Sequence, residues 1–205
     1  MVVHRCFIAI RLETASQATL QAFLKDIQGR LPGARWVKPK NAHLTLKFLG
    51  DVDQDRLERI ATIIKLACNG MHCTALEMRG LGVFPSMKSP RILWLGLAGN
   101  LTSLSTTVQR LDEHLEELGW HKEKQTWVPH ITLARFDRIA HRRTAGRTND
   151  PRRQETRERL LEILKQNAGE KVGTLHVTSV DLMESTLTPS GSIYRPLFVC
   201  SLNAN

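Results

Sequence analysis

The same order of predicted helices and strands occurs twice along this chain of 205 residues, and no other feature of the sequence restricts the fold as strongly. Each copy contains a helix, a strand that begins with His-x-Thr, a second helix and two further strands. One additional strand, residues 5–12, precedes the first copy. The two His-x-Thr strands, HLTLKFLG from His43 and HITLARF from His130, are 87 residues apart. Their apolar residues alternate with polar ones, as in a strand with one buried face.

The repeated order predicts an α+β fold with two similar lobes. Each lobe is expected to have a mostly antiparallel sheet and helices, and a pseudo-twofold axis would relate the two lobes around a central cleft. We therefore predict a single bilobal domain, residues 1–205, with sequence halves of about 1–99 and 100–205. The axis would bring His43 and His130 to facing positions on either side of the cleft.

The second copy contains extra residues after its His-x-Thr strand. Matches nearer the C-terminus, such as Pro85 with Pro189 and Arg91 with Arg195, are 104 residues apart instead of 87. The sequence RIAHRRTAGRTNDPRR, which is rich in arginine and has almost no apolar periodicity, accounts for the difference. We predict a basic flexible loop at residues 137–153.

The chain is basic, with 29 Lys and Arg residues against 20 Asp and Glu residues and a formal net charge of +9. This charge favours polyanionic partners and leaves RNA, DNA, nucleotides and anionic lipids as alternatives. No segment approaches the ~20 apolar residues that span a bilayer, and the apolar run near the N-terminus is too short for a signal peptide. The four cysteines form no C-x-x-C pair and are expected to be reduced thiols. These features together predict a cytoplasmic protein.

Sequence patterns that bind metals or nucleotide phosphates are missing from the chain. There is no H-E-x-x-H, no paired C-x-x-C and no Asp-rich loop, so no structural or catalytic metal is expected. No Walker-type glycine loop occurs either, and no cofactor is predicted. Any ligation that the chain catalyses should therefore proceed without ATP.

The His-x-Thr strands suit the cleavage of a phosphodiester. Residues i and i+2 of a strand point the same way, so His43 and Thr45 project together, as do His130 and Thr132. Two histidines can act as acid and base near neutral pH if one starts charged and the other neutral. The threonine hydroxyls can donate hydrogen bonds to the non-bridging phosphate oxygens. Two candidates for a nearby cation are Arg135 and Lys47.

The chain contains two further His-x-Thr sequences, which begin at His72 and His176. They too obey the repeat, because they are 104 residues apart, so symmetry alone does not select the site. We prefer His43 and His130 because each begins a clear apolar alternation. The other two sequences have the character of entries from a loop into a strand.

Two segments, HLTLKFLG at 43–50 and PHITLAR at 129–135, resemble the paired motifs of the two-histidine (2H) phosphoesterase superfamily. Further similarity, in RCFIAI, PRILWLG and ESTLTPSGSIY, runs almost from end to end. Within the superfamily the chain most resembles the bacterial and archaeal RNA 2′,3′-cyclic phosphodiesterases, historically called 2′-5′ RNA ligases. The resemblance implies hydrolysis of a terminal 2′,3′-cyclic phosphate on RNA to a 2′-phosphate, without a metal.

The resemblance also implies roles for single residues. His43 would be the proton donor to the departing 3′ oxygen, and His130 would be the proton acceptor that activates water. Thr45 and Thr132 would hold the phosphate oxygens, and Arg135 would assist them in binding the substrate. A strictly alternating strand, however, would turn Arg135 away from His130.

Two alternatives remain open. The motifs supply the phosphate chemistry but not the identity of the substrate, so small cyclic nucleotides or 2′-5′ oligoadenylates are alternative substrates. A protein of another class, a non-catalytic RNA-binding protein, would use the basic charge and make no use of the histidines. For the enzyme we expect a monomer whose partner is RNA or an oligonucleotide with a 2′,3′-cyclic phosphate end, with no membrane partner.

Overall fold

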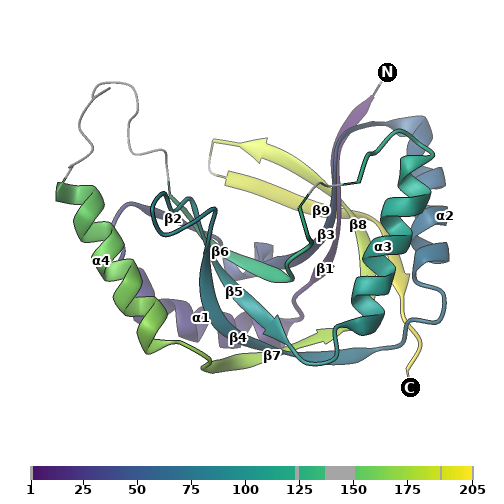
Figure 1. The fold of residues 1–205 in the computed structure, drawn as a ribbon. Coiled ribbons are helices and arrows are strands. Elements are labelled where there is room, and N and C mark those ends of the chain that lie inside the picture. The colour runs from purple at the N-terminus through teal and green to yellow at the C-terminus, as the bar shows by residue number, and fades with distance from the viewer. Residues whose placement is uncertain (1, 123–124, 137–150, 190, 205) are drawn as a thin grey trace.

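The computed structural model describes residues 2–122, 125–136, 151–189 and 191–204 (Figure 1). Within these residues there are four α-helices: α1 (Thr14–Gln28), α2 (Leu57–Ala67), α3 (Thr102–Glu116) and α4 (Pro151–Gln166). The same residues form nine strands: β1 (Val3–Arg11), β2 (Ala34–Trp36), β3 (His43–Asp53), β4 (Thr74–Phe84), β5 (Ile92–Ala98), β6 (His130–Phe136), β7 (Lys171–Val177), β8 (Ser179–Thr188) and β9 (Gly191–Ser201). Two short 3-10 helices precede β3 and α2: η1 (Pro39–Asn41) and η2 (Gln54–Arg56).

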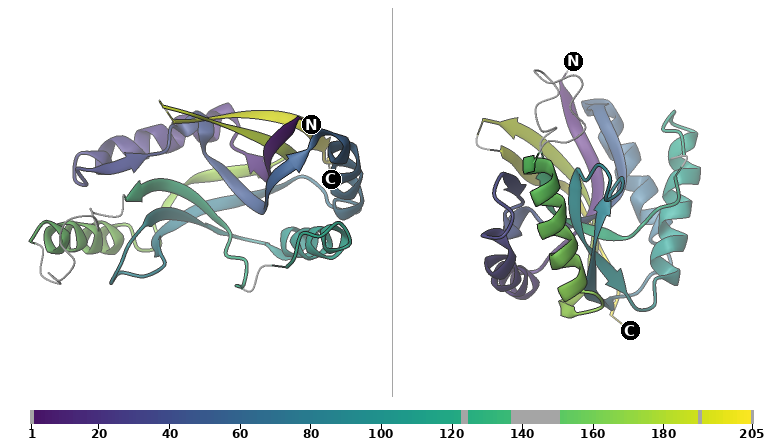
Figure 2. Two further views of the ribbon diagram at one scale, coloured as in Figure 1. Left: turned by 90° about the horizontal axis from the view of Figure 1, so that it is seen from above. Right: turned by 60° about the vertical axis from the view of Figure 1, so that its left-hand side comes forward.

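All nine strands of the described residues belong to one antiparallel sheet, in the order β7-β4-β5-β6-β3-β1-β8-β9, with β2 beside β6. The sheet curls, with α1 and α4 at one end of the molecule and α2 and α3 at the other (Figures 1 and 2). Its two halves are joined where β3 meets β6, through the single residue pair Leu44 and Ile131. The prediction of an α+β fold with mostly antiparallel sheet is confirmed.

Strands from the two sequence halves are exchanged within the sheet. The first-half strand β4 lies between β5 and β7, whereas the second-half strand β8 lies between β1 and β9. Outward from β3 the sheet continues with β1, β8 and β9, and outward from β6 it continues with β5, β4 and β7. The two series correspond if β1, β3 and β4 are matched with β5, β6 and β8. The front strand is therefore the first element of the repeat, with β5 as its counterpart, and the prediction that it is additional is wrong. This order is the one that a pseudo-twofold axis between β3 and β6 would give.

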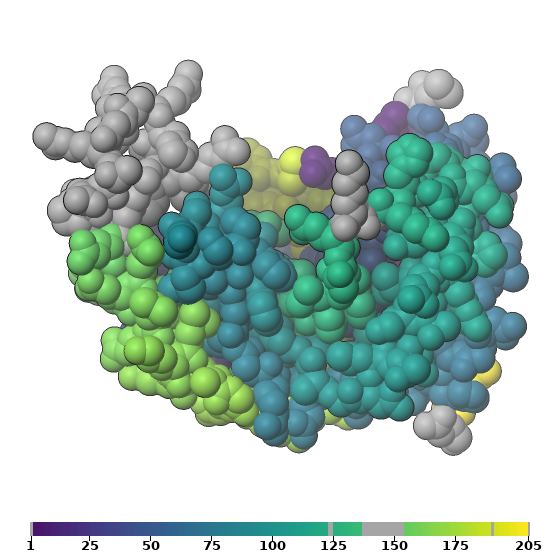
Figure 3. Space-filling view, in the orientation of Figure 1, coloured from purple at the N-terminus to yellow at the C-terminus, as the bar shows by residue number. Residues whose placement is uncertain are grey.

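The helices pack on one face of the sheet and leave the opposite face to form a cleft. In β1 the side chains of Cys6, Ile8 and Ile10 are buried in the main core with the apolar residues of all four helices. The alternate residues Phe7 and Ala9 face the other way and form a separate small cluster with Met183 and Tyr194. In the space-filling view the surface is recessed at its upper centre, in front of the β8–β9 hairpin (Figure 3).

Bulges in β3 and β6 reverse the alternation of the two His-x-Thr strands. In β3 the pairing with β1 skips Leu46 and then Leu49, and in β6 the pairing with β5 skips Leu133. A bulged residue shifts the side chains that follow it, up to the next bulge, to the opposite face. Consequently Lys47, which immediately follows the first bulge, is buried on the helix face of the sheet.

Lys47 forms a buried ion pair with α3. Its Nζ lies 2.5 Å from Asp112 Oδ1 and donates a second hydrogen bond, 2.9 Å long, to the carbonyl oxygen of His121. The Lys47 side chain is 4% exposed, whereas that of Asp112 is 21% exposed. The prediction that Lys47 could supply a cation to the phosphate site is wrong, because its charge is neutralised on the other face of the sheet.

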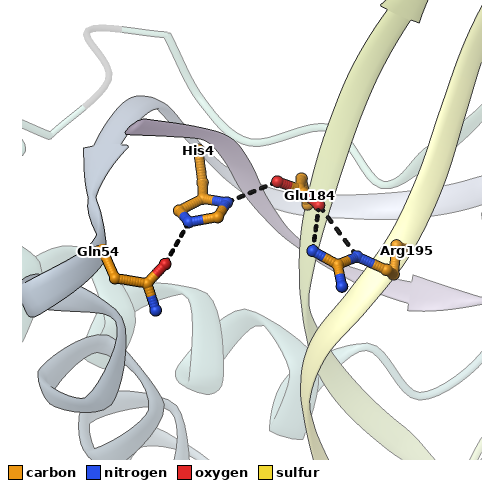
Figure 4. Close-up of polar contacts among 4 residues, drawn as sticks. All are labelled: His4, Gln54, Glu184 and Arg195. Carbon is orange, nitrogen blue, oxygen red and sulfur yellow. Dashed lines mark hydrogen bonds and ion pairs between the residues drawn. The ribbon is translucent and has the colours of Figure 1, made fainter. Parts of the chain in front are cut away.

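A second polar network fastens β1 to the β8–β9 hairpin (Figure 4). His4 Nδ1 lies 2.5 Å from Glu184 Oε1, and the other ring nitrogen of His4 contacts Gln54 of η2. Arg195 donates two hydrogen bonds to Glu184 Oε2, at 3.0 and 2.8 Å. The pKa of Glu184 is lowered mainly by its hydrogen bond with His4 and, to a smaller extent, by its hydrogen bonds with Arg195. The pKa of His4 is raised, and the hydrogen bond with Glu184 is the main cause. This network holds the hairpin whose other end lines the cleft.

Other sequence predictions have mixed outcomes. Residues 137–150 of the predicted basic loop lie outside the described residues, and 151–153 belong to α4. All four cysteines are free, with Cys6 and Cys68 buried. No helix among the described residues has both the length and the apolar character needed to cross a membrane.

Removal of either partner of the Lys47–Asp112 pair should have unequal effects on stability. Asp112→Ala leaves a buried ammonium with one carbonyl partner, and we expect it to lower the free energy of unfolding by about 3 kcal/mol. Lys47→Met leaves a carboxylate that water can reach, and the expected loss is about 1 kcal/mol. Urea denaturation measures both, with Glu113→Ala as a control at a neighbouring exposed position of α3. Equal losses for the two variants would contradict this account of the pair.

Candidate active site

The five predicted site residues line one cavity of about 610 Å³ on the face of the sheet opposite the helices. His43 and Thr45 come from β3, and His130, Thr132 and Arg135 come from β6. Both histidines begin their strands next to the pair that joins the two halves of the sheet, since Leu44 follows one and Ile131 follows the other. The cavity therefore lies across this join and receives one His-x-Thr pair from each side.

The two imidazoles are held in the same way. Nδ1 of His43 is 2.7 Å from the carbonyl oxygen of Asn41, and Nδ1 of His130 is 2.7 Å from the carbonyl oxygen of Val128. A carbonyl oxygen only accepts hydrogen bonds, so Nδ1 must carry a proton in both rings. In the neutral form Nε2 is then the unprotonated nitrogen. Among the described residues no partner bonds Nε2 of either histidine, which leaves both atoms available to a substrate.

Aromatic rings surround each histidine. The ring of His43 lies 4.8 Å from that of Phe7 and 5.2 Å, edge-on, from that of Tyr194. The ring of His130 lies 4.9 Å from that of Phe84 and 6.0 Å from that of Trp94. Such contacts fix the orientation of the imidazoles and keep water away from one side of each.

Trp94 depends on a glycine in the neighbouring strand. A Cβ atom at Gly82, which pairs with Trp94 across β4 and β5, would come within 2.1 Å of the indole ring. Gly82 therefore lets the indole lie against the strand, beside His130. The prediction that Trp94 is buried within an apolar strand is only partly right, because the ring is half-buried and belongs to the cleft face.

The surroundings lower the pKa of both histidines below the ordinary value of 6.5. Burial is the largest cause in each case, because it penalises the charged imidazolium. The hydrogen bond to the backbone carbonyl opposes this effect, and the positive charge of Arg135 adds to it at both rings. The charge of His130 lowers the pKa of His43 further. Both histidines are therefore mainly neutral at pH 7 when the cavity holds no anion.

Arg135 reaches the cavity because of the bulge at Leu133. Strict alternation would turn Arg135 away from His130, and the bulge removes this objection to the predicted place of Arg135 in the site. The corresponding bulge in β3 brings Phe48 to the cavity, five residues after His43, as Arg135 is five residues after His130. The repeat thus places a cation on one side of the cleft and an exposed aromatic ring, 61% accessible, on the other.

The other two His-x-Thr sequences do not line this cavity. His72 lies in an isolated bridge with Asn203, and His176 contacts Glu13 with half of its side chain exposed. Nor does any cluster of three or more His, Cys, Asp or Glu side chains in the described part of the chain have an arrangement that could hold a metal ion.

Residues that sequence reasoning missed come from distant parts of the chain. Phe7 could have been found from the alternation of β1, whose odd-numbered residues face the cleft. Alternation gives no such signal for Asn41 and Tyr194, because their contacts with His43 depend on a 3-10 turn and on a hairpin about 150 residues further along. No local pattern records such contacts.

Comparison with known proteins gives a consistent result. Residues 10–94 match the model of the LigT like Phosphoesterase family. The RNA 2′,3′-cyclic phosphodiesterase of Methanothermobacter thermautotrophicus is 30% identical over 97% of this chain and 98% of its own length. The enzyme of the same name from Aeropyrum pernix is 32% identical over 79% of this chain and 82% of its own length.

Two solved structures share the fold. The protein TT0787 of Thermus thermophilus has a TM-score of 0.72 and 24% identity over 98% of this chain and 99% of that chain. LigT of E. coli complexed with 3′-AMP has a TM-score of 0.71 and 20% identity over the same shares of the two chains. The resemblance seen in the sequence is confirmed, and with such similarity over nearly the whole of both sequences the chain belongs to the LigT-like family of two-histidine phosphoesterases.

Proposed function

We propose that this protein hydrolyses the 2′,3′-cyclic phosphate at the end of an RNA to a 2′-phosphate, without a metal ion. The observation that carries the proposal is the pair of histidines with unbonded Nε2 atoms in one cavity, each oriented by the same kind of backbone acceptor. The relatives named RNA 2′,3′-cyclic phosphodiesterase support the choice of substrate. The basic charge of the chain agrees with an RNA partner.

The proposed reaction is an in-line displacement at phosphorus. Nε2 of His130 accepts a proton from water, and the oxygen of that water attacks phosphorus opposite the 3′ oxygen. Nε2 of His43 donates a proton to the departing 3′ oxygen, which becomes a hydroxyl, while the phosphate stays on the 2′ oxygen. The hydroxyls of Thr45 and Thr132 and the guanidinium of Arg135 bind the non-bridging oxygens, where negative charge is concentrated in the transition state.

The substrate itself favours the charged form of His43. Because burial and Arg135 keep both histidines neutral in the empty cavity, one of them must gain a proton before the reaction. A bound phosphate diester carries a negative charge, and an opposite charge close to a histidine raises its pKa. After turnover, His43 is neutral and His130 is charged, and exchange of protons with water restores the starting state.

Ligation would use the same geometry. A 5′-hydroxyl that takes the place of water would attack the cyclic phosphate and form a 2′-5′ linkage, again without ATP.

We also propose that the enzyme acts in the cytoplasm as a monomer. The four free thiols support the first of these statements.

The test of the proposed activity is an oligonucleotide with a 2′,3′-cyclic phosphate end, incubated with the protein in EDTA. We expect hydrolysis to a 2′-phosphate, identified by phosphorus NMR. His43→Ala and His130→Ala should each lower kcat/KM by about 10²- to 10⁴-fold, the usual contribution of a general acid or base. His72→Ala is the matched control, because His72 belongs to a His-x-Thr sequence outside the cavity.

Three outcomes would count against the proposal. Strict dependence on added metal would contradict catalysis by side chains alone. Normal turnover in folded His43 or His130 variants would favour a protein that binds RNA without cutting it. Faster hydrolysis of a small cyclic nucleotide or a 2′-5′ dimer than of the cyclic-ended oligonucleotide would identify the alternative substrates.

Removal of Arg135 should change both the rate and its pH dependence. Arg135→Gln should lower kcat/KM about 100-fold, as expected for loss of one group that stabilises transition-state charge. The charge of Arg135 lowers the pKa of both histidines, so its removal should raise both pKa values and move both limbs of the kcat/KM profile to higher pH. NMR titration of the ligand-free protein measures the pKa values directly. Arg5→Gln is the control, because Arg5 lines the cavity but is not a cause of either shift; equal shifts in both variants would contradict a specific effect of Arg135.

A further inference from the structure

A second, smaller pocket adjoins the active-site cavity. It has a volume of about 220 Å³ and is lined by Lys38, Lys40 and residues 191–194 of the β8–β9 hairpin, together with Asn41. Asn41, Ser192 and Tyr194 line both pockets, so the two pockets share a wall. Two of these shared residues also contact His43, because the Asn41 carbonyl bonds Nδ1 and the Tyr194 ring lies 5.2 Å from the imidazole. The lysine pocket therefore lies on the His43 side of the cleft.

The turn that carries the two lysines is held from both sides of the cleft. Before the turn, the backbone N–H of Val37 donates to the carbonyl oxygen of Leu133 in β6, at 2.8 Å. At its end, Nδ2 of Asn41 donates to the carbonyl oxygen of Ser192 in β9, at 2.9 Å. Pro39, at the first position of the 3-10 helix, further limits the backbone. The positions of Lys38 and Lys40 are thus determined by the same contacts that build the active site.

The charge of this pocket is not neutralised by the described residues. No carboxylate lines it, and neither the side chain of Lys38 nor that of Lys40 forms an ion pair or hydrogen bond with any described residue. Lys47 differs in this respect, because it pairs with Asp112. Two exposed lysines at one end of the cleft form a site for an anion. A volume of about 220 Å³ is below the usual range for a whole small-molecule ligand and suits a single group such as a phosphate.

The direction of the proposed reaction places the RNA chain on this side of the cleft. In an in-line displacement, water and the leaving oxygen occupy opposite sides of phosphorus. The leaving 3′ oxygen belongs to the ribose, and the ribose continues through its 5′ carbon into the rest of the RNA. Since His43 is the proposed proton donor to the 3′ oxygen, the body of the RNA extends toward His43 and away from His130.

We propose that Lys38 and Lys40 bind the phosphate on the 5′ oxygen of the terminal nucleotide, which in RNA is the phosphodiester to the preceding nucleotide. This subsite rests on the proposed function and specifies its substrate class: an RNA end with at least one further phosphate is preferred over a cyclic mononucleotide. The subsite also depends on the assignment of His43 as the acid. If His130 were the acid instead, the RNA would extend toward β6 and Arg135.

Three substrates that differ by single groups test the subsite. They are adenosine 2′,3′-cyclic phosphate, the same compound with a 5′-phosphate, and the dinucleotide ApA with a 2′,3′-cyclic phosphate end. In the wild-type protein, we expect the 5′-phosphate to raise kcat/KM roughly 5- to 10-fold, and the dinucleotide to show a similar gain. In Lys38→Gln/Lys40→Gln this advantage should be lost. The slope of log kcat/KM against log salt concentration for the dinucleotide should also become shallower in this variant, because fewer charged contacts remain to be screened.

Two further double variants serve as controls. Lys38→Arg/Lys40→Arg keeps the charge and should keep most of the preference for the 5′-phosphate. Lys25→Gln/Lys165→Gln removes two charges from the last turns of α1 and α4 and should leave the preference as in the wild-type protein. Loss of the preference in this second variant would show that net charge alone is responsible, and would overturn the subsite.

The remaining outcomes separate this inference from the proposed function. If the wild-type protein hydrolyses all three substrates at similar kcat/KM, or favours only the dinucleotide, no subsite for the 5′-phosphate exists. If the lysine variant loses activity equally on all three, the lysines position the His43 turn and do not bind phosphate. If the wild-type protein hydrolyses none of them, the proposed function is itself wrong and the subsite with it.

Discussion

The contact between Leu44 and Ile131 is the constraint on which the site depends. It is the single pair through which β3 and β6 join the two halves of the sheet, and both side chains are fully buried. His43 and His130 precede these residues, so the join fixes how far apart the two imidazoles lie. The strand exchange adds to this constraint, because β4 and β8 each complete the sheet half that contains the other copy's first strand. Neither half of the cleft can form from one half of the chain.

Two bulges turn a repeated scaffold into an asymmetric site. Each His-x-Thr strand skips its fourth residue in its pairing, Leu46 in β3 and Leu133 in β6, and so presents its sixth residue to the cleft. In β3 this residue is Phe48 and in β6 it is Arg135. The matching bulges thus place an aromatic ring on one strand and a guanidinium on the other. A phosphate substrate that enters such a cleft meets different surroundings on its two sides, which allows two similar histidines to have different roles.

Much of the fold and part of the site could be predicted from the sequence because the signals are local. Apolar periodicity located the four helices and most strands, and alternation beginning at His43 and His130 selected these residues over His72 and His176. Alternation alone gives the wrong face for Lys47 and would have turned Arg135 out of the cavity, where the resemblance placed it correctly. A bulge arises from pairing with a neighbouring strand and leaves no mark on the alternation itself. The counterpart of the front strand was missed for a related reason. Residues 91–97 (RILWLGL) match the second strand of the later hairpin by spacing, yet in the sheet β5 occupies the place that corresponds to β1.

The distribution of charge around the cleft suits the acid and base roles proposed for the two histidines. Burial and Arg135 lower both pKa values, so both imidazoles are neutral in the empty cavity. A further cation beside His43 would make its protonation still less favourable. Lys47, which is four residues from His43, is turned to the opposite face and neutralised by Asp112, while Lys38 and Lys40 lie in a separate pocket at the end of the cleft. In the proposed reaction, the positive charge of Lys38 and Lys40 is therefore kept apart from His43, and His43 gains its proton when the substrate brings its own negative charge between the two strands.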